Sequence, residues 1–140
     1  NTPPSVVPTN TPTRTATPGS GAGGGTYDDT DAAITYTGLW SSYVWAGTYN
    51  GSARYSNAVG NTARLTFTGT SFTLLHSRAP NRGVMSITVD GVMIANLNQY
   101  GSDVTVRNQW TSPTLSAGTH MLVLSHASGS YTDLDAIMVR

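Results

Sequence analysis

The sequence contains no cysteine, no lysine and no glutamate among its 140 residues. Without cysteine the chain has no disulfide, no thiolate chemistry and no cysteine-based zinc site, so its stability must come from packing. All seven basic residues are arginine and all seven acidic residues are aspartate, which leaves a net charge of zero. Nucleic-acid phosphates attract proteins with concentrated positive charge, and this chain has no basic cluster. We therefore expect no nucleic-acid partner.

Long hydrophobic runs are also missing. No segment approaches the roughly 20 apolar residues that span a membrane, and no signal peptide is present, so we expect a soluble chain that begins after processing or is a fragment. Lysine and glutamate are strong helix formers, and their absence is combined here with abundant threonine, valine, tyrosine and glycine. This composition predicts an all-β domain.

Residues 1–25 differ in composition from the remainder of the chain. They hold five of the seven prolines, many threonines and a terminal glycine run. Such a segment is typical of an extended Pro/Thr-rich linker with a flexible hinge, so we divide the chain into a tail, 1–25, and one domain, 26–140. Thr-Pro tracts join domains of secreted bacterial proteins and are plausible O-glycan carriers, which favours an extracellular or cell-surface location. Simple disorder is the alternative interpretation.

The tail is long relative to the domain. Fully extended it spans roughly 75 Å at about 3.1 Å per residue, whereas a globule of about 115 residues has a radius of gyration near 13 Å. Its apolar piece, Ser5, Val6 and Val7, is suited to add as a strand to a neighbouring copy or to lie in a groove on it. A tail that leaves one subunit and enters the next makes a heterologous contact, and such contacts give fibres when they do not close. The tail therefore predicts head-to-tail assembly.

From residue 26 onward, short strand-like runs alternate with glycine-rich turns, and no helical period is present. Ala63, Leu65 and Phe67 alternate with polar residues, which is the period of a half-buried strand. The pattern predicts an antiparallel β-sandwich or jelly roll of about eight or nine strands. The expected strands cover residues 33–37, 53–57, 63–68, 72–77, 84–90, 93–98, 104–110, 120–125 and 133–139.

Two of these strands carry apolar residues on both faces. In residues 120–125, Met121 and Val123 alternate with Leu122 and Leu124, and residues 133–139 show a similar pattern. Strands of this kind are typical of the centre of a sheet that is covered on both sides. We therefore expect a loop or another subunit over their outer faces.

Residues 71–91 combine two strands with a polar loop. The loop at 78–83 holds two arginines, a rigid proline and a permissive glycine, so polar side chains can project there from a fixed scaffold. Asp90 and Gly91 lie between two valines, and type I′ turns need positive φ at both central positions. This dipeptide predicts a tight hairpin.

Several short motifs occur together in a consistent order. They are ITYTGLW at 34–40, GTYNG at 47–51, ARLTFTG at 63–69, RAPNRG at 78–83, VDG at 89–91, LSAGTH at 115–120 and DLDAI at 133–137. Over residues 27–140 this layout resembles the galactose-binding-like jelly-roll domains attached to many bacterial secreted enzymes. The resemblance implies a β jelly roll that serves as a platform for binding sugars or proteins. The chain departs from it at Leu74, Leu75 and His76, where the family commonly has a wall for sugar stacking.

Aromatic residues and arginines supply candidate binding groups. Sugar recognition needs flat aromatic faces for stacking and polar partners for hydroxyl groups, and the same residue types are enriched at protein interfaces. In the structural alternative, Trp40 and Tyr36 belong to the core and the arginines pair with Asp90 or with backbone carbonyls. The candidate ligand-binding or interface residues are Trp40, Tyr43, Trp45, Tyr49, Arg78, Asn81 and Arg82.

Aspartates gather near the two ends of the domain: Asp28, Asp29 and Asp31 at its start, and Asp133 and Asp135 at its end. Calcium binds six to eight carboxylate and carbonyl oxygens, and the terminal strands of jelly rolls of this type often run side by side. The resemblance implies a structural calcium ion here, as related modules carry one. Ordinary turn chemistry is the alternative role for these aspartates.

The chain offers little for catalysis. Glycosidases need two carboxylates that face each other, whereas every aspartate here lies near a turn or a terminus. His76, His120 and His126 lack a nucleophile elbow, so we expect no enzyme activity. The triplet at 50–52, NGS, matches a glycosylation sequon and equally a hairpin turn.

Two functions from different classes follow. In the first, the protein is a non-catalytic structural subunit whose tail docks onto neighbouring copies and builds an extracellular filament. In the alternative, it is a carbohydrate-binding module on a linker, attached to a secreted enzyme. The partners are neighbouring copies in the first case and glycans in the second.

Overall fold

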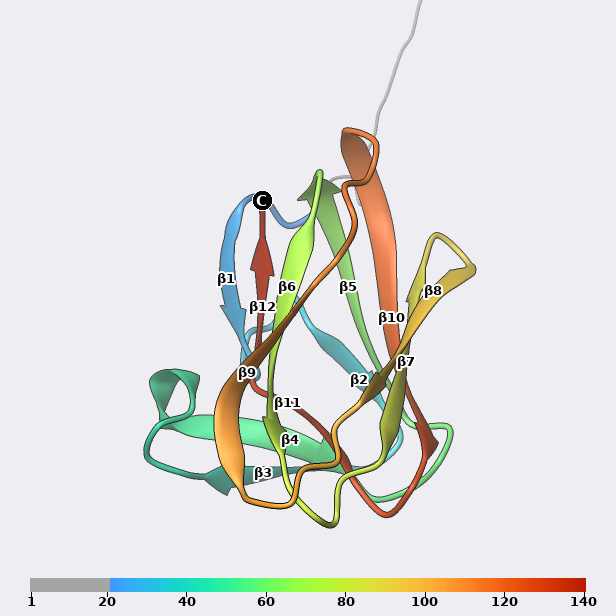
Figure 1. Cartoon of the computed structure of the whole chain (residues 1–140). Coiled ribbons are helices and arrows are strands. Elements are labelled where there is room, and N and C mark those ends of the chain that lie inside the picture. The colour runs from blue at the N-terminus through green and yellow to red at the C-terminus, as the bar shows by residue number, and fades with distance from the viewer. Residues whose placement is uncertain (1–20) are drawn as a thin grey trace, which may run out of the picture.

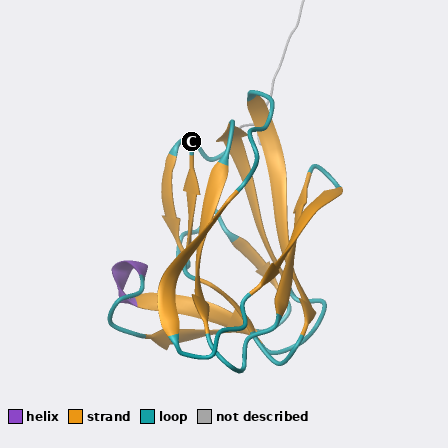
Figure 2. Ribbon diagram, in the orientation of Figure 1, coloured by secondary structure: helices purple, strands orange, loops and turns teal. Residues whose placement is uncertain are grey.

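The computed structural model describes residues 21–140. This part of the chain is built from strands and loops, with one short 3₁₀ turn at Tyr49–Gly51 (Figure 2). It contains no helix that is long and apolar enough to cross a membrane. The predicted tail-docking residues Ser5, Val6 and Val7 lie outside the described residues.

Two main sheets and one small sheet make up the domain (Figure 1). The main sheets have the strand orders β1-β12-β6-β9 and β2-β5-β10-β7-β8, and the small sheet, β11-β4-β3, closes one end of the sandwich. Every named strand pair is antiparallel, which confirms the predicted sandwich. The strands are β1 (Gly25–Asp28), β2 (Thr35–Thr37), β3 (Trp40–Val44), β4 (Ser52–Ser56), β5 (Thr62–Gly69), β6 (Phe72–Arg78), β7 (Val84–Val89), β8 (Val92–Asn98), β9 (Thr105–Thr111), β10 (Gly118–Ser128), β11 (Thr132–Leu134) and β12 (Ala136–Val139).

The core lies between the two main sheets. β5 buries Leu65 and Phe67 from one sheet, and β6 buries Phe72 and Leu74 from the other. The rings of Phe67 and Phe72 meet edge to face, with their centroids 5.5 Å apart. Each large apolar side chain that is fully buried contributes about 1.5–3 kcal/mol, so this interleaving holds the sheets together.

The predicted hairpin at residues 90–91 joins β7 to β8. Asp90 and Gly91 have φ values of 52° and 82°, the positive values that a type I′ turn requires. The Asp90 carboxylate also accepts a hydrogen bond from the backbone of Met121 (2.8 Å) and contacts His120 Nδ1 (2.7 Å). The hairpin is therefore fixed to the central strand β10.

Three features differ from the sequence-based expectations. β1 and β3 were not expected to be strands: β1 is four residues long and starts in a glycine run, and β3 is rich in serine and aromatic residues. β10 is central, as expected, but its outer face is not covered in the described domain. Met121 is 42% exposed and Val123 is only half-buried. Coverage of that face by a loop is therefore wrong within the described domain, and coverage by another subunit stays a prediction, whereas residues 133–139 are largely buried as expected.

Backbone pairing with the domain begins at Ala22. This residue bridges Phe67, its N–H donates to the carbonyl of Thr66 (2.8 Å), and its carbonyl accepts from Thr68 (2.9 Å). A boundary at residues 25–26 stays a prediction from composition, while the described packing already includes residue 22.

Candidate functional site

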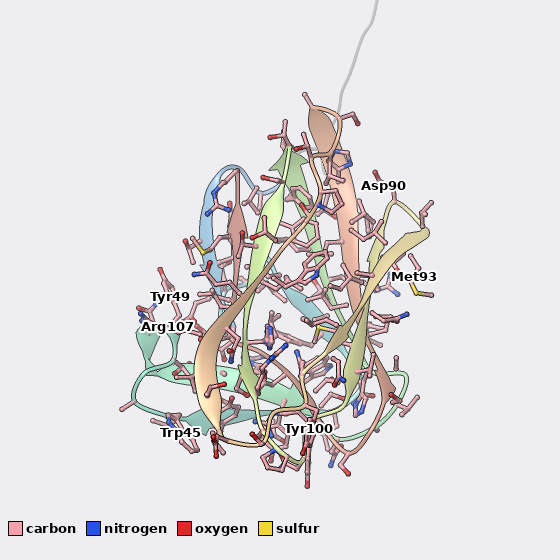
Figure 3. The ribbon with its side chains drawn as sticks, in the orientation of Figure 1. Trp45, Tyr49, Asp90, Met93, Tyr100 and Arg107 are labelled. Carbon is pink, nitrogen blue, oxygen red and sulfur yellow. The ribbon has the colours of Figure 1, made fainter. Side chains whose placement is uncertain are left out.

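A cavity of about 270 Å³ opens beside the small sheet, and we call it the aromatic pocket. It lies where loops from four parts of the chain meet at one end of the sandwich, and Figure 3 shows Trp45 projecting at this end. Its lining residues are Tyr43, Trp45, Tyr55, Ser77, Asn81, Arg82, Val104, Val106 and Tyr131.

A buried ion pair forms the polar floor of the aromatic pocket. Asp133 in β11 is fully buried, and its Oδ2 lies 3.0 Å from Nη2 and 3.1 Å from Nε of Arg82. Tyr43 donates its hydroxyl to the same oxygen (2.8 Å), and the Ser77 backbone N–H donates to Oδ1 (2.9 Å). The Ser77 hydroxyl adds a further hydrogen bond. The carboxylate is thus satisfied by one cation and several donors, as a buried charge requires.

The backbone of Asp133 is held as firmly as its side chain. Gln99 is fully buried, accepts a hydrogen bond from the Asp133 N–H (2.8 Å) and donates to its carbonyl (2.9 Å). One amide side chain therefore satisfies both backbone groups. This clamp fixes the floor of the pocket relative to the end of β8.

Tyrosine rings form one wall of the pocket. Tyr43 and Tyr55 come from the paired strands β3 and β4, with ring centroids 5.9 Å apart, and Tyr131 meets Tyr55 edge to face at 5.5 Å. Burial, with the nearby Asp133 carboxylate, raises the pKa of Tyr43 to about 12. The Tyr43 hydroxyl therefore stays protonated and keeps its donor role at neutral pH.

The loop at residues 78–83 is locked to neighbouring segments. The Gly83 N–H donates to the carbonyl of Tyr131 (2.6 Å), and the Gly83 carbonyl accepts from Gln99 (2.9 Å). A Cβ at residue 83 would lie 2.0 Å from the carbonyl oxygen of Ser128, so only glycine permits this approach. The backbone contact brings the segments of Arg82 and Tyr131 together, and both residues line the pocket.

Four of the seven candidate binding residues meet in the aromatic pocket: Tyr43, Trp45, Asn81 and Arg82. The other three lie elsewhere. Trp40 packs on Tyr36, at 5.2 Å between ring centroids, against the core, as in the structural alternative. Tyr49 lies with Arg107 at a separate groove, where the two side chains appear together in Figure 3. Arg78 is exposed and does not line the pocket.

Sequence reasoning missed the tyrosines at 55 and 131 and the role of Asp133 under Arg82. Tyr55 faces Tyr43 only because β4 pairs with β3, and β3 was not expected. The arginines were expected to pair with Asp90 or a backbone carbonyl, whereas Arg82 pairs with Asp133 and Asp90 contacts His120. A period-2 pattern identifies a strand but not its partner.

The five aspartates proposed for calcium occupy three separate places. Asp133 belongs to the aromatic pocket, and Asp31 accepts a hydrogen bond from the Ala33 N–H (2.8 Å) in a turn. Asp28, Asp29 and Asp135 are near one another, since β1 pairs with β12 and the Asp29 N–H donates to the Asp135 carbonyl (3.0 Å). Within residues 21–140, no group of three or more histidines and aspartates is arranged to hold a metal ion.

Two carboxylate oxygens in the Asp28, Asp29 and Asp135 group nevertheless have no hydrogen-bond partner. They are Asp28 Oδ1 and Asp29 Oδ2, and the second lies 3.7 Å from Arg54 Nε. Burial is the main reason that the pKa of Asp29 is raised to about 6. It is also the main reason that the pKa of Asp135 is raised to about 6. Carboxylate oxygens are the ligands that calcium prefers, and these two have no other hydrogen-bond partner, so calcium at this place stays a prediction.

Comparison with known proteins gives two similar sequences from Flavonifractor plautii. The chain is 33% identical over 95 residues to an A type blood N-acetyl-alpha-D-galactosamine deacetylase, covering 68% of this chain and 12% of that protein. It is 32% identical over 101 residues to an A type blood alpha-D-galactosamine galactosaminidase, covering 70% of this chain and 9% of that one. The chain thus spans about a tenth of these relatives. No protein-family model matches the sequence.

Solved structures show the same fold at low sequence identity. A family 35 carbohydrate binding module from an environmental isolate superposes with a TM-score of 0.61 at 15% identity, over 82% of this chain and 91% of that chain. An exo-beta-1,3-galactanase from Phanerochaete chrysosporium gives a TM-score of 0.60 at 19% identity, over 85% of this chain and 30% of that one. The expected galactose-binding-like jelly roll is therefore confirmed as the fold.

The two functions predicted from the sequence are unequally supported by these comparisons. Both sequence relatives act on sugars of A type blood, and the fold is that of a carbohydrate-binding module. The filament role receives no support from them. The comparisons favour the alternative function over the first.

Proposed function

We propose that residues 26–140 form a non-catalytic carbohydrate-binding module that holds an extracellular protein at a glycan through the aromatic pocket. The observation that carries this proposal is the union, in one cavity, of exposed aromatic rings with a fixed polar floor. Sugars present apolar C–H faces and a rim of hydroxyl groups, so they need both kinds of surface at once.

Trp45 is the stacking surface of this pocket. Its side chain is 47% exposed and projects at the loop end of the domain (Figure 3). The tyrosines beside it are only half-buried. An exposed flat ring next to a cavity is the arrangement that a sugar face requires.

The volume of the pocket favours a short ligand. Ligand pockets span about 300–1,000 Å³, and the aromatic pocket, at about 270 Å³, is slightly smaller than that range. We therefore propose that it takes the terminal unit of a glycan.

The chemistry of the pocket favours binding over hydrolysis. None of the described residues that line it is a carboxylate, and Asp133 beneath it is engaged by Arg82, Tyr43 and Ser77. Glycoside hydrolysis needs two carboxylates free to face the bond. The relatives support an accessory role as well, because the similar segment makes up only 12% and 9% of two large glycan-acting proteins.

The direct test is calorimetric titration of the domain with a glycan panel that includes the sugars of A type blood, using Trp45→Ala and a matched aromatic control, Tyr49→Ala. Tyr49 lies in a different groove. We expect Trp45→Ala to weaken binding about tenfold, about 1.4 kcal/mol, and Tyr49→Ala to leave it unchanged. Equal loss in both variants, or no binding across a broad panel, would reject the proposal.

A further inference from the structure

The two charges at the floor of the aromatic pocket neutralise each other, because both belong to protein side chains. Arg82 contributes the positive charge and Asp133, fully buried, neutralises it at 3.0 Å. A bound ligand therefore meets no uncompensated charge at the floor. A second carboxylate placed on Arg82 would lie close to Asp133 in a region of low dielectric, where like charges repel strongly.

Arg82 and Asn81 offer donors to a ligand, beside the hydroxyls of Tyr55 and Tyr131, which can donate or accept. Arg82 has five N–H groups, of which Nε and Nη2 contact Asp133 and Nη1 donates to Asn81 Oδ1 (2.7 Å). One N–H on each terminal nitrogen remains. Because its oxygen is occupied, Asn81 is left with its NH₂ group, which adds two further donors. A ligand with a strong neutral acceptor, such as an amide carbonyl, matches this floor.

An apolar strip lies in the same cavity. Val104, which is 50% exposed, directly precedes β9 and Val106 lies within it, and both line the pocket with Trp45. Plain hydroxyl groups gain nothing from such a strip. Burying a methyl group against this strip would favour binding by about 0.8 kcal/mol.

We infer that the aromatic pocket selects an N-acetylhexosamine, whose acetamido carbonyl accepts from Arg82 and Asn81 and whose methyl group packs on Val104 and Val106. The inference rests on the proposed function and names its ligand class. An unacetylated hexosamine carries an ammonium group that meets donors and no free acceptor carboxylate, and a uronic acid carries a carboxylate for which no free cation remains.

The experiment is calorimetric titration with four sets of methyl glycosides, each in gluco and galacto forms: N-acetylhexosamine, hexose, hexosamine and uronic acid. A pH of about 6 keeps the amine charged, since free amino groups titrate nearer 8. We expect the N-acetylated sugar to bind at least fivefold more tightly than the hexose, and the two charged sugars to bind more weakly than the hexose.

Two variants separate the parts of the inference. Val106→Thr keeps the side-chain volume but adds a hydroxyl, so it should lower the affinity for the N-acetyl sugar more than the affinity for the hexose. Asp133→Asn frees the charge of Arg82, so it should raise uronic acid affinity relative to the other sugars. Circular dichroism confirms that each variant is folded, and Val106→Thr decides the case if Asp133→Asn does not fold.

The outcomes distinguish the inference from the function beneath it. If the hexose, hexosamine or uronic acid binds as tightly as the N-acetylated sugar, and Trp45→Ala weakens that binding, the selectivity is wrong and the carbohydrate-binding function stands. If none of the sugars binds, or binding is indifferent to Trp45→Ala, the proposed function fails and the inference fails with it.

Discussion

Arg82 and Asp133 approach each other through two nitrogens and one oxygen, with Nε at 3.1 Å and Nη2 at 3.0 Å from Oδ2. The aspartate is fully buried and the arginine side chain is 13% exposed. This pair joins the loop at residues 78–83 to strand β11, so the pocket floor and the small sheet are one structural unit.

Removing the cation from this pair should destabilise the domain strongly. Arg82→Met leaves the Asp133 carboxylate buried without a countercharge, and we expect a loss of about 3–5 kcal/mol in the free energy of unfolding. Urea unfolding followed by tryptophan fluorescence measures it. The double variant Arg82→Met with Asp133→Asn should lose less than the sum of the single changes, because it removes both charges.

Arg64→Met is the matched control, because Arg64 is exposed on β5. Its effect should stay within about 0.5 kcal/mol. If Arg64→Met and Arg82→Met cost the same, the buried ion pair does not stabilise the domain in the way described.

The sequence alone predicted the fold well because most strands have a recognisable pattern in their own residues. The alternation of Ala63, Leu65 and Phe67 with polar residues and the turn at Asp90 and Gly91 depend on neighbours in the chain only. β3 was missed because its serines and aromatics have no clean period. Its strand identity comes from pairing with β4, a tertiary effect that overrides local preference.

The site was only partly predictable, for a related reason. The loop with Asn81 and Arg82 was recognisable from its composition, but Asp133 is 51 residues away and was grouped with the other aspartates by charge type. Asp133 was expected to bind a calcium ion, whereas in the structure its charged partner is the guanidinium of Arg82. Which charges meet is decided by the sheet topology, and no local pattern contains that information.

Gly83 should be one of the least replaceable residues near the pocket. A Cβ there would lie 2.0 Å from the Ser128 carbonyl oxygen and 2.7 Å from the Gly129 Cα, both of them backbone atoms. We expect Gly83→Ala to cost about 2–4 kcal/mol by forcing the two loops apart. The shift should also weaken sugar binding, because Arg82 is next in the chain. Thermal unfolding and titration measure the two effects.

Gly23→Ala is the control for the glycine change, because a Cβ at residue 23 meets nothing within 4 Å. Its melting temperature should match that of the unchanged domain. A Gly83→Ala domain with unaltered stability would show that the close approach of the two loops is not required.

Stability should depend on pH through Asp29 and Asp135. Burial is the main cause that raises the pKa of each to about 6 from an ordinary value of 3.8. The folded state then binds more protons than the unfolded state between about pH 4 and 6, so this stabilisation is fully present below pH 3.8 and is lost as pH rises through about 6. In a buffer without divalent cations, the melting temperature should fall across this window. Asp29→Asn should flatten the fall, whereas Asp103→Asn, at an exposed position, should not.

Calcium should restore the stability that is lost above pH 6. Asp28 Oδ1 and Asp29 Oδ2 are buried without hydrogen-bond partners, and a cation bound to them would replace the missing protons. Weak extracellular calcium sites have dissociation constants of about 0.1–1 mM. About 10 mM calcium at pH 7 is therefore a tenfold excess or more and should add at least about 1.4 kcal/mol to the free energy of unfolding.

Differential scanning fluorimetry with calcium, and with magnesium for comparison, measures the rise in melting temperature. Asp29→Asn should abolish the calcium response and Asp103→Asn should retain it. If the unchanged domain melts at the same temperature with calcium and with a chelator, the two oxygens are not a calcium site, and the carboxylates are accommodated by protonation and by Arg54 alone.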